Sequence, residues 1–206
     1  MNKGYFITLE GGEGVGKTTN LRFVREFLER RGKRVLATRE PGGTPVGEKI
    51  RALFLGDGEV SPETELLLVF AARAQHLLDV IEPALESGAW VVCDRFTDAS
   101  YAYQGGGRQV DAEFILALEE RVQKGRQPDL TLLFDAPVEV GMARAKKRGP
   151  IDRMEKETLA FYERVREAYL RLAGRFPNRV KLIDASRPIV EVEEAIATHL
   201  NNLCGQ

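Results

Sequence analysis

A glycine-rich segment near the start of the chain constrains the fold more than any other feature. Directly after an apolar run, residues 11–18 read Gly-Gly-Glu-Gly-Val-Gly-Lys-Thr, the phosphate-binding pattern of a glycine, four residues and Gly-Lys-Ser/Thr. Glycines let backbone N–H groups turn inward around phosphate oxygens, Lys17 places a charge against the β- and γ-phosphates, and Thr18 offers a hydroxyl to Mg²⁺. The helical pattern that follows adds the positive end of its dipole. The segment predicts a nucleoside triphosphate site, and a purely structural glycine-rich turn is the alternative.

Five short apolar runs alternate with longer stretches of helical pattern. The runs span residues 5–10, 34–38, 90–94, 130–135 and 180–184. Because they are rich in Val, Ile, Leu and Phe with little alternation, they predict strands buried on both faces, as in a parallel sheet. Helical patterns cover residues 21–28, 113–123, 138–147, 157–173 and 190–203, and Ser61-Pro62 caps a further helix that Pro83 kinks or restarts. This order predicts an α/β fold with a five-stranded parallel sheet flanked by helices.

Composition excludes several classes of protein. Thirty Lys and Arg against 31 Asp and Glu give a formal net charge of −1, so we expect no protein that holds nucleic acid by bulk positive charge. With 43% hydrophobic residues, dominant disorder is excluded. The chain lacks about 18 consecutive apolar residues and a signal-peptide pattern, and Cys93 and Cys204 are too few for a disulfide framework. We expect one cytoplasmic domain over residues 1–206, with no membrane partner and with Cys93 buried.

Among proteins that bind nucleoside triphosphates, the sequence favours a small kinase. A signalling GTPase needs an aspartate followed three residues later by glycine, and no aspartate here has that spacing. No Asn-Lys-x-Asp guanine motif occurs either, and a motor or remodelling ATPase usually needs a longer chain. A kinase needs an acceptor pocket, a carboxylate near the metal, and positive charge that closes over the transferred phosphoryl group.

The carboxylate near the metal has a candidate after the third apolar run, and the positive charge has one near residue 150. Asp94 and Arg95 follow a strand and so lie at the carboxyl edge of the sheet, where open α/β folds bind ligands. A carboxylate that only caps the next turn is the alternative for Asp94. Residues 141–157 carry a net charge of +3 around Gly149-Pro150, which suits either a mobile lid over phosphates or a solvated charge run.

The acceptor pocket has candidates in two further segments. Arg39 begins a segment rich in Gly and Pro, residues 39–44, and its guanidinium is suited to hold an acceptor phosphate through two hydrogen bonds. Phe70 and Arg73 stand three apart on the predicted helix and share a face. This pair suits stacking on a base and reading it, and ordinary core and surface positions are the alternative.

Taken together, these motifs resemble the thymidylate kinase family over nearly the whole chain. The matching segments are the phosphate loop with Glu13, 39–44, Phe70 with Arg73, Asp94-Arg95-Phe96, 103–108 and Asp152-Arg153. The chain resembles the bacterial form with a catalytic arginine in the lid, because its phosphate loop carries Glu13 and no arginine. Tyr101, where a more polar residue is expected after Ser100, is the departure from the pattern.

The resemblance implies a P-loop nucleoside monophosphate kinase-like fold with a mobile lid at about residues 141–157. It implies transfer of the γ-phosphoryl group of ATP to dTMP with Mg²⁺, in the synthesis of dTTP, by a homodimer. The ATP-binding residues would be Gly11, Gly12, Glu13, Gly14, Val15, Gly16, Lys17, Thr18, Thr19 and Arg187. The metal would lie at Thr18 and Asp94, and the catalytic side chains would be Lys17, Arg95, Arg153 and Arg148.

The same resemblance assigns dTMP to nine side chains: Glu13, Arg39, Arg51, Phe70, Arg73, Arg95, Ser100, Tyr103 and Gln104. Phe70 would stack on thymine, Arg73 would bond its carbonyl edge, and Tyr103 would crowd the 2′ position and so favour deoxyribose. Glu13 would face the 3′-hydroxyl.

The predicted chemistry needs no general base, because a phosphate monoester has a second pKa near 6 and is largely ionised. His76 and His199 are therefore expected as surface or packing residues. Two alternatives stay open: a kinase of this architecture with another nucleoside monophosphate or a small metabolite as acceptor, and a non-catalytic nucleotide-binding regulator.

Overall fold

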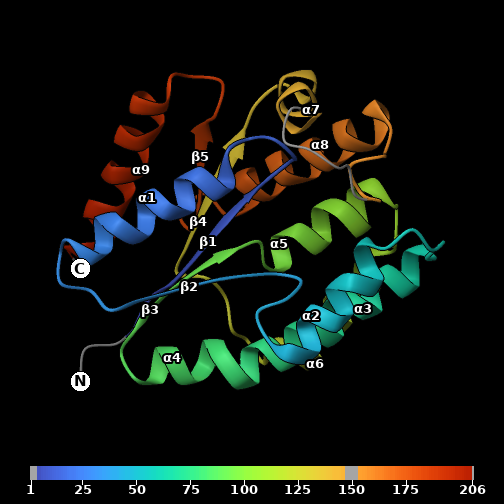
Figure 1. Ribbon diagram of the computed structural model, residues 1–206, viewed down its shortest axis with the longest axis horizontal. Helices are drawn as coiled ribbons and strands as arrows, with labels where there is room; N and C mark the ends of the chain where they lie inside the picture. Colours follow the sequence, from blue (N-terminus) through green and yellow to red (C-terminus); the bar gives the residue numbers. More distant parts are fainter. Residues whose placement is uncertain (1–3, 147–152, 206) are drawn as a thin grey trace.

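The computed structural model describes residues 4–146 and 153–205, which form a parallel sheet between layers of helices (Figure 1). The strands are β1 (Phe6–Gly11), β2 (Val35–Arg39), β3 (Trp90–Asp94), β4 (Leu130–Asp135) and β5 (Val180–Asp184). They lie in the order β2-β3-β1-β4-β5, and every neighbouring pair is parallel. The predicted five-stranded parallel sheet is confirmed, with the first two strands shifted by one residue.

The register of the sheet brings the ends of its strands to one edge. Arg39 at the end of β2 lies opposite Asp94 at the end of β3, and Asp94 in turn lies opposite Leu9 of β1. Every residue of β1 is buried, as expected for a strand covered on both faces. The three segments that follow these strands therefore start close together, and they carry the motifs for phosphate, acceptor and metal.

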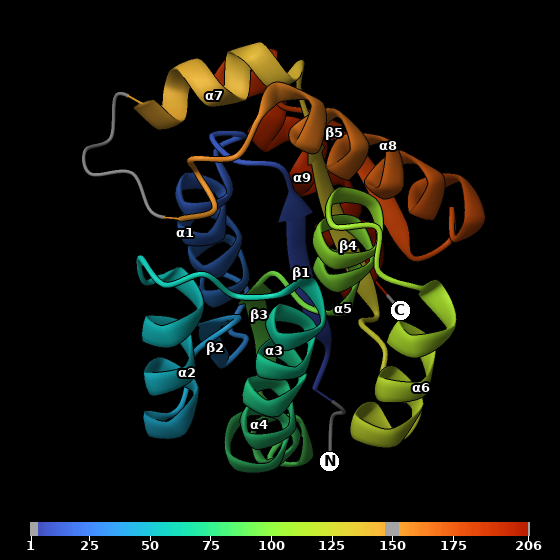
Figure 2. The ribbon, with the colours of Figure 1, turned by 90° about the vertical axis from the view of Figure 1, so that its right-hand side faces the viewer.

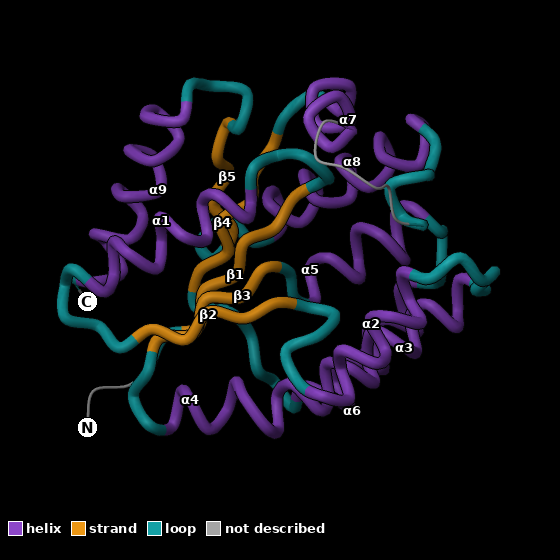
Figure 3. Tube along the Cα trace, in the orientation of Figure 1, coloured by secondary structure: helices purple, strands orange, loops and turns teal. Residues whose placement is uncertain are grey.

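Successive side chains of the strands point to opposite faces of the sheet and pack into two apolar layers. Ile7 and Leu9 pack with α1 (Lys17–Glu29) and α9 (Ile189–Cys204) on one face. Phe6 packs on the other face with α4 (Glu82–Glu86), and α8 (Leu159–Arg175) covers the same face over β4 and β5. The tube in Figure 3 shows the strands running through the middle of the molecule with helices on both sides. Cys93 is fully buried among the apolar side chains, as expected.

The long helix predicted after Ser61 is a succession of three helical segments. It consists of α3 (Pro62–His76), a π-helical stretch at Leu77–Ile81, and α4. The change of winding comes just before Pro83, which stands in the first turn of α4. A wider turn there frees the hydrogen-bond position that proline cannot fill, so the expected restart is confirmed.

The sequence did not predict α2 (Pro45–Leu55), nor the short helical segments at Thr97–Ser100 and Tyr101–Gly107. The α2 helix begins with Thr44, whose side chain accepts from Gly47 N–H, and Pro45 stands in its first turn. This is the signature that Ser61-Pro62 shows for α3. Because Gly42 and Gly43 directly precede Thr44, the local composition indicates a loop rather than the start of a helix.

The remaining helical segments follow β3 and β4 in the chain. They are α5 (Thr97–Ser100), a π-helical segment at Tyr101–Gly107, α6 (Ala112–Gln123) and α7 (Val138–Lys146). Figure 2 shows α2, α3 and α6 as neighbouring helices below, with α7 and α8 above the sheet. Within the described residues, no helix is long and apolar enough to cross a membrane.

Candidate active site

A cavity of about 570 Å³ lies at the carboxyl edge of β1, β2 and β3. One part of its lining comes from the phosphate loop and the start of α1: Glu13, Gly14, Gly16, Lys17, Thr18 and Thr19. The other part comes from the predicted acceptor and metal residues: Arg39, Arg51, Arg73, Asp94, Arg95, Ser100, Tyr103 and Gln104. The structure therefore brings most of the predicted site residues around one space.

The phosphate loop folds as its glycines require. Gly14 and Gly16 have φ values of 69° and 89°, in the left-handed region that side chains disfavour, and Gly16 directly precedes α1. A Cβ on Gly14 would lie 1.9 Å from the Gly141 carbonyl oxygen, so the loop touches the backbone of α7. The N-terminus of α1 lines the cavity through Gly16, Lys17 and Thr18.

Lys17 reaches back over the phosphate loop. Its Nζ donates to the carbonyl oxygens of Gly12 (2.6 Å) and Gly11 (3.2 Å). Burial lowers the pKa of Lys17 to about 8, and the positive charge of Arg95 acts in the same direction. A phosphate in the loop would supply the negative charge that keeps this ammonium protonated.

Arg95 is held in the cavity wall by several partners. Its Nη1 donates to the carbonyl oxygen of Gly11 (2.8 Å) and to the Tyr169 hydroxyl (3.3 Å), and its Nη2 pairs with the Glu13 carboxylate. The guanidinium also lies 4.6 Å from the ring centre of Tyr103. Its backbone φ is 70°, which is unfavourable for arginine, so the packing around it must impose this turn.

Other predicted acceptor residues lie farther along the same wall. Tyr103 donates to Glu13 Oε1 (3.2 Å), which places both side chains beside Arg95. Arg39 makes two hydrogen bonds to Glu48, and Arg51 Nη1 donates to the Pro41 carbonyl (3.0 Å).

Several predicted residues do not line the cavity in this structure. Phe70 is 2% exposed and packs with Leu66 and Ile115, while its neighbour Val69 lines the cavity. Arg153 donates to the Phe54 carbonyl (2.8 Å) and pairs with buried Glu65.

Of two further predicted residues, Arg187 for ATP binding and Arg148 for catalysis, the structure describes only the first. Arg187 is exposed after β5 and pairs with Asp184 (3.2 Å). Arg148, like Asp152, lies outside the described residues. Tyr101, the departure from the family pattern, donates to Glu119 (2.7 Å) and does not line the cavity.

Sequence reasoning missed a set of buried polar residues next to the cavity: Glu10, Glu40, Glu65, His76 and Tyr169. The available signal was a carboxylate at each of two strand ends, Glu10 before the phosphate loop and Glu40 after β2. His76 is fully buried, so of the two predicted settings the structure shows packing rather than surface.

Glu10 is a buried carboxyl group directly below the phosphate loop. Its Oε1 accepts from Phe96 N–H (2.6 Å) and its Oε2 from the Tyr169 hydroxyl (2.7 Å). Burial raises the pKa of Glu10 to about 8, and the negative charge of Asp98 adds to the effect. The carboxyl group therefore stays protonated at neutral pH.

We expect Glu10→Gln to flatten the pH dependence of stability. An unfolded glutamate ionises near pH 4.5, whereas folded Glu10 keeps its proton to about pH 8. Between these values the folded state binds more protons, so the free energy of unfolding of the unmodified chain falls as pH rises. Relative to the variant, which cannot ionise, the loss between pH 5 and pH 8.5 is on the order of 4 kcal/mol. Denaturant unfolding of the variant and the unmodified chain at pH 5 and pH 8.5 measures this loss. If the free energies of unfolding of the two proteins differ by the same amount at both pH values, the prediction is wrong.

A phosphate loop and an arginine-rich acceptor wall around one cavity, on a parallel sheet in this strand order, define a P-loop nucleoside monophosphate kinase. Comparison with known proteins agrees. The sequence model of the thymidylate kinase family matches residues 9–196. The chain belongs to the thymidylate kinase family, whose members phosphorylate dTMP.

Individual relatives extend this match over nearly the full chain. Thymidylate kinase of Methylococcus capsulatus is 58% identical over 203 residues, 98% of each chain. That of Alkalilimnicola ehrlichii is 58% identical over 96% of this chain and 94% of its own. The crystal structure of thymidylate kinase from Ehrlichia chaffeensis has a TM-score of 0.79 at 32% identity, with 97% of this chain and 99% of that chain covered.

Proposed function

We propose that this chain transfers the γ-phosphoryl group of ATP to the phosphate of dTMP, giving ADP and dTDP for the synthesis of dTTP. One observation carries the proposal: the lysine of the phosphate loop and the acceptor arginines line the same cavity. Two polyanions that must meet in line need such a space, with positive charge on both sides.

The mechanism rests on positioning and charge. The acceptor oxygen of dTMP is largely ionised at neutral pH, so no side chain has to remove a proton. Lys17 neutralises the donor phosphates, and Arg95 lies between the phosphate loop and the acceptor wall, where charge develops during transfer. Arg153, which now pairs with Glu65, would leave that carboxylate to contact the transferred group. Arg148, which lies outside the described residues, is still proposed as a catalytic side chain.

Mg²⁺ is the proposed cofactor, and the residues fit it. Asp94 Oδ1 is buried and has no hydrogen-bond partner among the described residues, while Thr18 lines the same cavity. Mg²⁺ typically binds one or two protein oxygens and completes its shell with water and substrate phosphates. When bound, the ion would neutralise charge on the β- and γ-phosphates, and Asp94 with Thr18 would hold it.

The acceptor wall divides into three proposed parts. Arg95 with Arg39 and Arg51 holds the dTMP phosphate. Tyr103 and Glu13, joined by a hydrogen bond, face the sugar at its 2′ and 3′ positions. The base contacts are Arg73, Ser100 and Gln104, with Phe70 as the proposed stacking partner.

On the donor side, we propose that the adenine of ATP lies near Arg187. Arg144 of α7 lines the cavity and donates to the Ala185 carbonyl (2.9 Å), so the loop after β5 is tied to the cavity wall.

Replacing Phe70 by alanine is expected to raise KM for dTMP about 10-fold and to leave KM for ATP unchanged. The ring either stacks on the base or supports Arg73, whose guanidinium lies 4.5 Å from its centre, and contacts of this size are worth about 1 kcal/mol. Steady-state kinetics with each nucleotide varied in turn measures the effect. Phe70→Leu keeps apolar volume and controls for core packing. Equal losses for both nucleotides in the alanine variant would return Phe70 to a purely structural role.

The proposed reaction is tested by an ADP-release assay across possible acceptors. We expect turnover with dTMP well above that with dCMP, AMP or shikimate, and turnover of dUMP is measured beside them. Preference for another acceptor would support a different kinase of this architecture. Tight ATP binding without turnover of any acceptor would support a nucleotide-binding regulator instead.

We also propose that two copies associate through α2, α3 and α6 as a homodimer. Large apolar side chains are exposed on these helices: Val46, Leu53, Leu67, Phe114 and Leu116. The three helices are neighbours (Figure 2), so these exposed residues come from adjoining elements. Light scattering, which separates a 23.0 kDa chain from a pair, tests the assembly. The single-domain organisation over residues 1–206 and the cytoplasmic location are proposals too, the latter resting on ATP and dTMP as cytoplasmic metabolites.

A further inference from the structure

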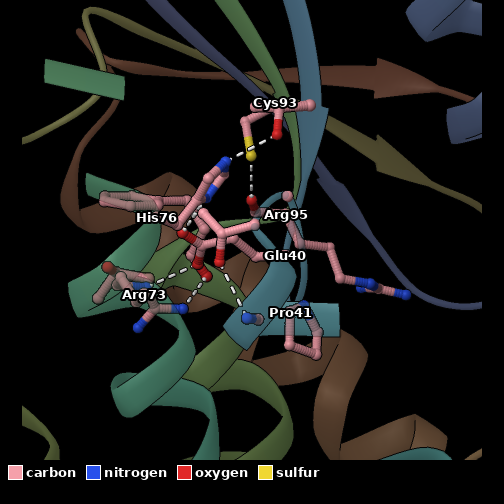
Figure 4. Close-up of polar contacts among 12 residues, drawn as sticks. Glu40, Pro41, Arg73, His76, Cys93 and Arg95 are labelled. Atoms are coloured by element: carbon pink, nitrogen blue, oxygen red, sulfur yellow. Dashed lines mark hydrogen bonds and ion pairs between the residues drawn. The ribbon is translucent and has the colours of Figure 1, made fainter. Parts of the chain in front are cut away.

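A buried carboxylate, Glu40, links two side chains of α3 at the edge of the cavity. Its Oε2 accepts from Arg73 Nε (2.7 Å), and its Oε1 lies 3.0 Å from His76 Nδ1. The exposed fractions of Glu40, Arg73 and His76 are 4%, 1% and 0%. Figure 4 shows Arg73 and His76 converging on the Glu40 carboxylate beside Pro41.

His76 and Glu40 are also held by contacts with the backbone and side chains around β2. His76 Nε2 lies 2.7 Å from the Thr38 hydroxyl, so the imidazole spans β2 and the residue that follows it. Gly43 packs against the same ring, since a Cβ there would lie 2.5 Å from Nε2. The Glu40 backbone N–H donates to the Asp94 carbonyl (2.9 Å), which ties the end of β2 to the end of β3. Glu40 therefore has little freedom to move.

Arg73 receives its orientation from this anchored carboxylate. Besides Nε, its Nη1 donates to the Ser100 hydroxyl (3.1 Å) and its Nη2 to the Phe96 carbonyl (3.0 Å). Within the described residues these bonds use three of the five N–H groups that a guanidinium carries. Arg73 also lines the cavity, so the two remaining N–H groups, one on each Nη, are the donors available to a ligand there.

A buried ion pair is weak evidence for stability, because removing two charges from water costs about as much as their attraction returns. Fixed donors at a ligand cavity have a different consequence. A guanidinium donates and never accepts, so it selects a base edge with a carbonyl and rejects one with an amino group. The rejection is strong only if the donors cannot turn away from the wrong base.

We propose that Glu40, held by His76 from behind, is a positioning residue that sets the Arg73 donors and thereby the preference for dTMP over dCMP. The inference rests on the proposed function, since it takes Arg73 to face the base. Glu40 acts through Arg73, and His76 acts through Glu40.

Four variants test the proposal: Glu40→Gln, His76→Gln, His76→Asn and Arg73→Ala. Glutamine at position 76 places its amide group where Nε2 of the His76 ring lies, so it keeps a hydrogen-bond partner for Thr38 but not for Glu40. Asparagine places its amide near Nδ1 and keeps a partner for Glu40. We measure kcat and KM for dTMP and dCMP, KM for ATP, and the melting temperature of each.

We expect Glu40→Gln and His76→Gln to raise KM for dTMP about 10-fold and to lower the dTMP:dCMP ratio of kcat/KM by about the same factor, with KM for ATP unchanged. His76→Asn is expected to keep the ratio within about 2-fold. A role in folding alone would lower the melting temperature and leave the ratio intact, because the ratio does not depend on the folded fraction.

The outcomes separate this inference from the proposed function. If Arg73→Ala lowers the ratio while Glu40→Gln and His76→Gln leave it unchanged, the positioning role is overturned and the base contact of Arg73 stands. If Arg73→Ala also leaves the ratio unchanged, both are overturned. If the unmodified chain does not prefer dTMP, the proposed function fails first, and this result needs no variant. Where Glu40→Gln does not fold, the two His76 variants carry the test.

Discussion

Alanine in place of Arg153 is expected to lower kcat about 10³-fold while KM for dTMP changes less than about 3-fold. The reason is that an arginine closing over the transferred phosphoryl group interacts mainly in the transition state. In the structure Arg153 is held by Glu65 and by the Phe54 carbonyl at the end of α2, so the proposed contact with phosphate requires it to leave these partners. Steady-state kinetics with saturating ATP and varied dTMP measures both constants.

The control for this prediction comes from the same segment. Lys156 pairs with Asp57 at 3.0 Å on the surface, and both side chains are exposed. Lys156→Ala removes one positive charge nearby and should change kcat less than about 2-fold, because exposed ion pairs contribute little. Unchanged turnover of Arg153→Ala, with only a weaker affinity for dTMP, would remove Arg153 from the transition state and leave it as a partner of Glu65.

Loss of the Arg95 side chain is expected to affect both binding and turnover. Arg95→Ala should lower kcat/KM for dTMP by at least about 10³-fold, because Arg95 is proposed to hold the acceptor phosphate and to stabilise charge during transfer. The same change removes the arginine partner of the Glu13 carboxylate, which keeps the hydrogen bond from Tyr103. Arg95→Lys keeps the charge without the fork of donors and should recover only part of the activity.

The strained backbone at Arg95 provides a matched control. Glycine at position 95 accepts the φ of 70° that alanine resists, so Arg95→Gly should be more stable than Arg95→Ala by about 1 kcal/mol. The two variants should nevertheless be equally inactive. If glycine restored activity, the loss in Arg95→Ala would come from the backbone rather than from the guanidinium. Thermal unfolding and kinetics on the same preparations compare the two.

The sheet and the donor side of the site could be predicted because local patterns determine them. A strand, a glycine loop and a helix start are contiguous in residues 5–19, and parallel strands bring their carboxyl ends to one edge. Asp94 and Arg95 were placed correctly by this rule alone. The cavity then gathers residues from three strand ends, as the order of the motifs predicts.

The helix facing the acceptor was predicted less accurately, and the reason is geometric. Phe70 and Arg73 share a helix face and do touch, with 4.5 Å between the guanidinium and the ring centre. The cavity, however, meets α3 along Val69 and Arg73, which are four residues apart. One residue turns a helix by about 100°, so a correct helix and a correct spacing still leave open which neighbour lines the wall. The role of Phe70 on the base stays a prediction.

The buried polar network could not be predicted from the sequence. Glu40, His76 and Thr38 come from two strand-end positions and the last residue of a helix, and only the packing of α3 against the edge of the sheet brings them together. Glu65 likewise collects Arg108 and Arg153 from distant segments. A single sequence shows such residues only as isolated polar positions among apolar ones.

The contact between the phosphate loop and α7 limits how this enzyme can vary over evolution. A Cβ at position 14 would lie 1.9 Å from the Gly141 carbonyl oxygen, and a Cβ at position 141 would lie 2.4 Å from the Glu13 carbonyl oxygen. At each position, backbone atoms occupy the space that a Cβ would need. A smaller side chain on the other segment cannot make room, because the atoms in the way are not side-chain atoms. A side chain at either position would therefore force the phosphate loop and α7 apart, which couples two positions that no sequence motif connects.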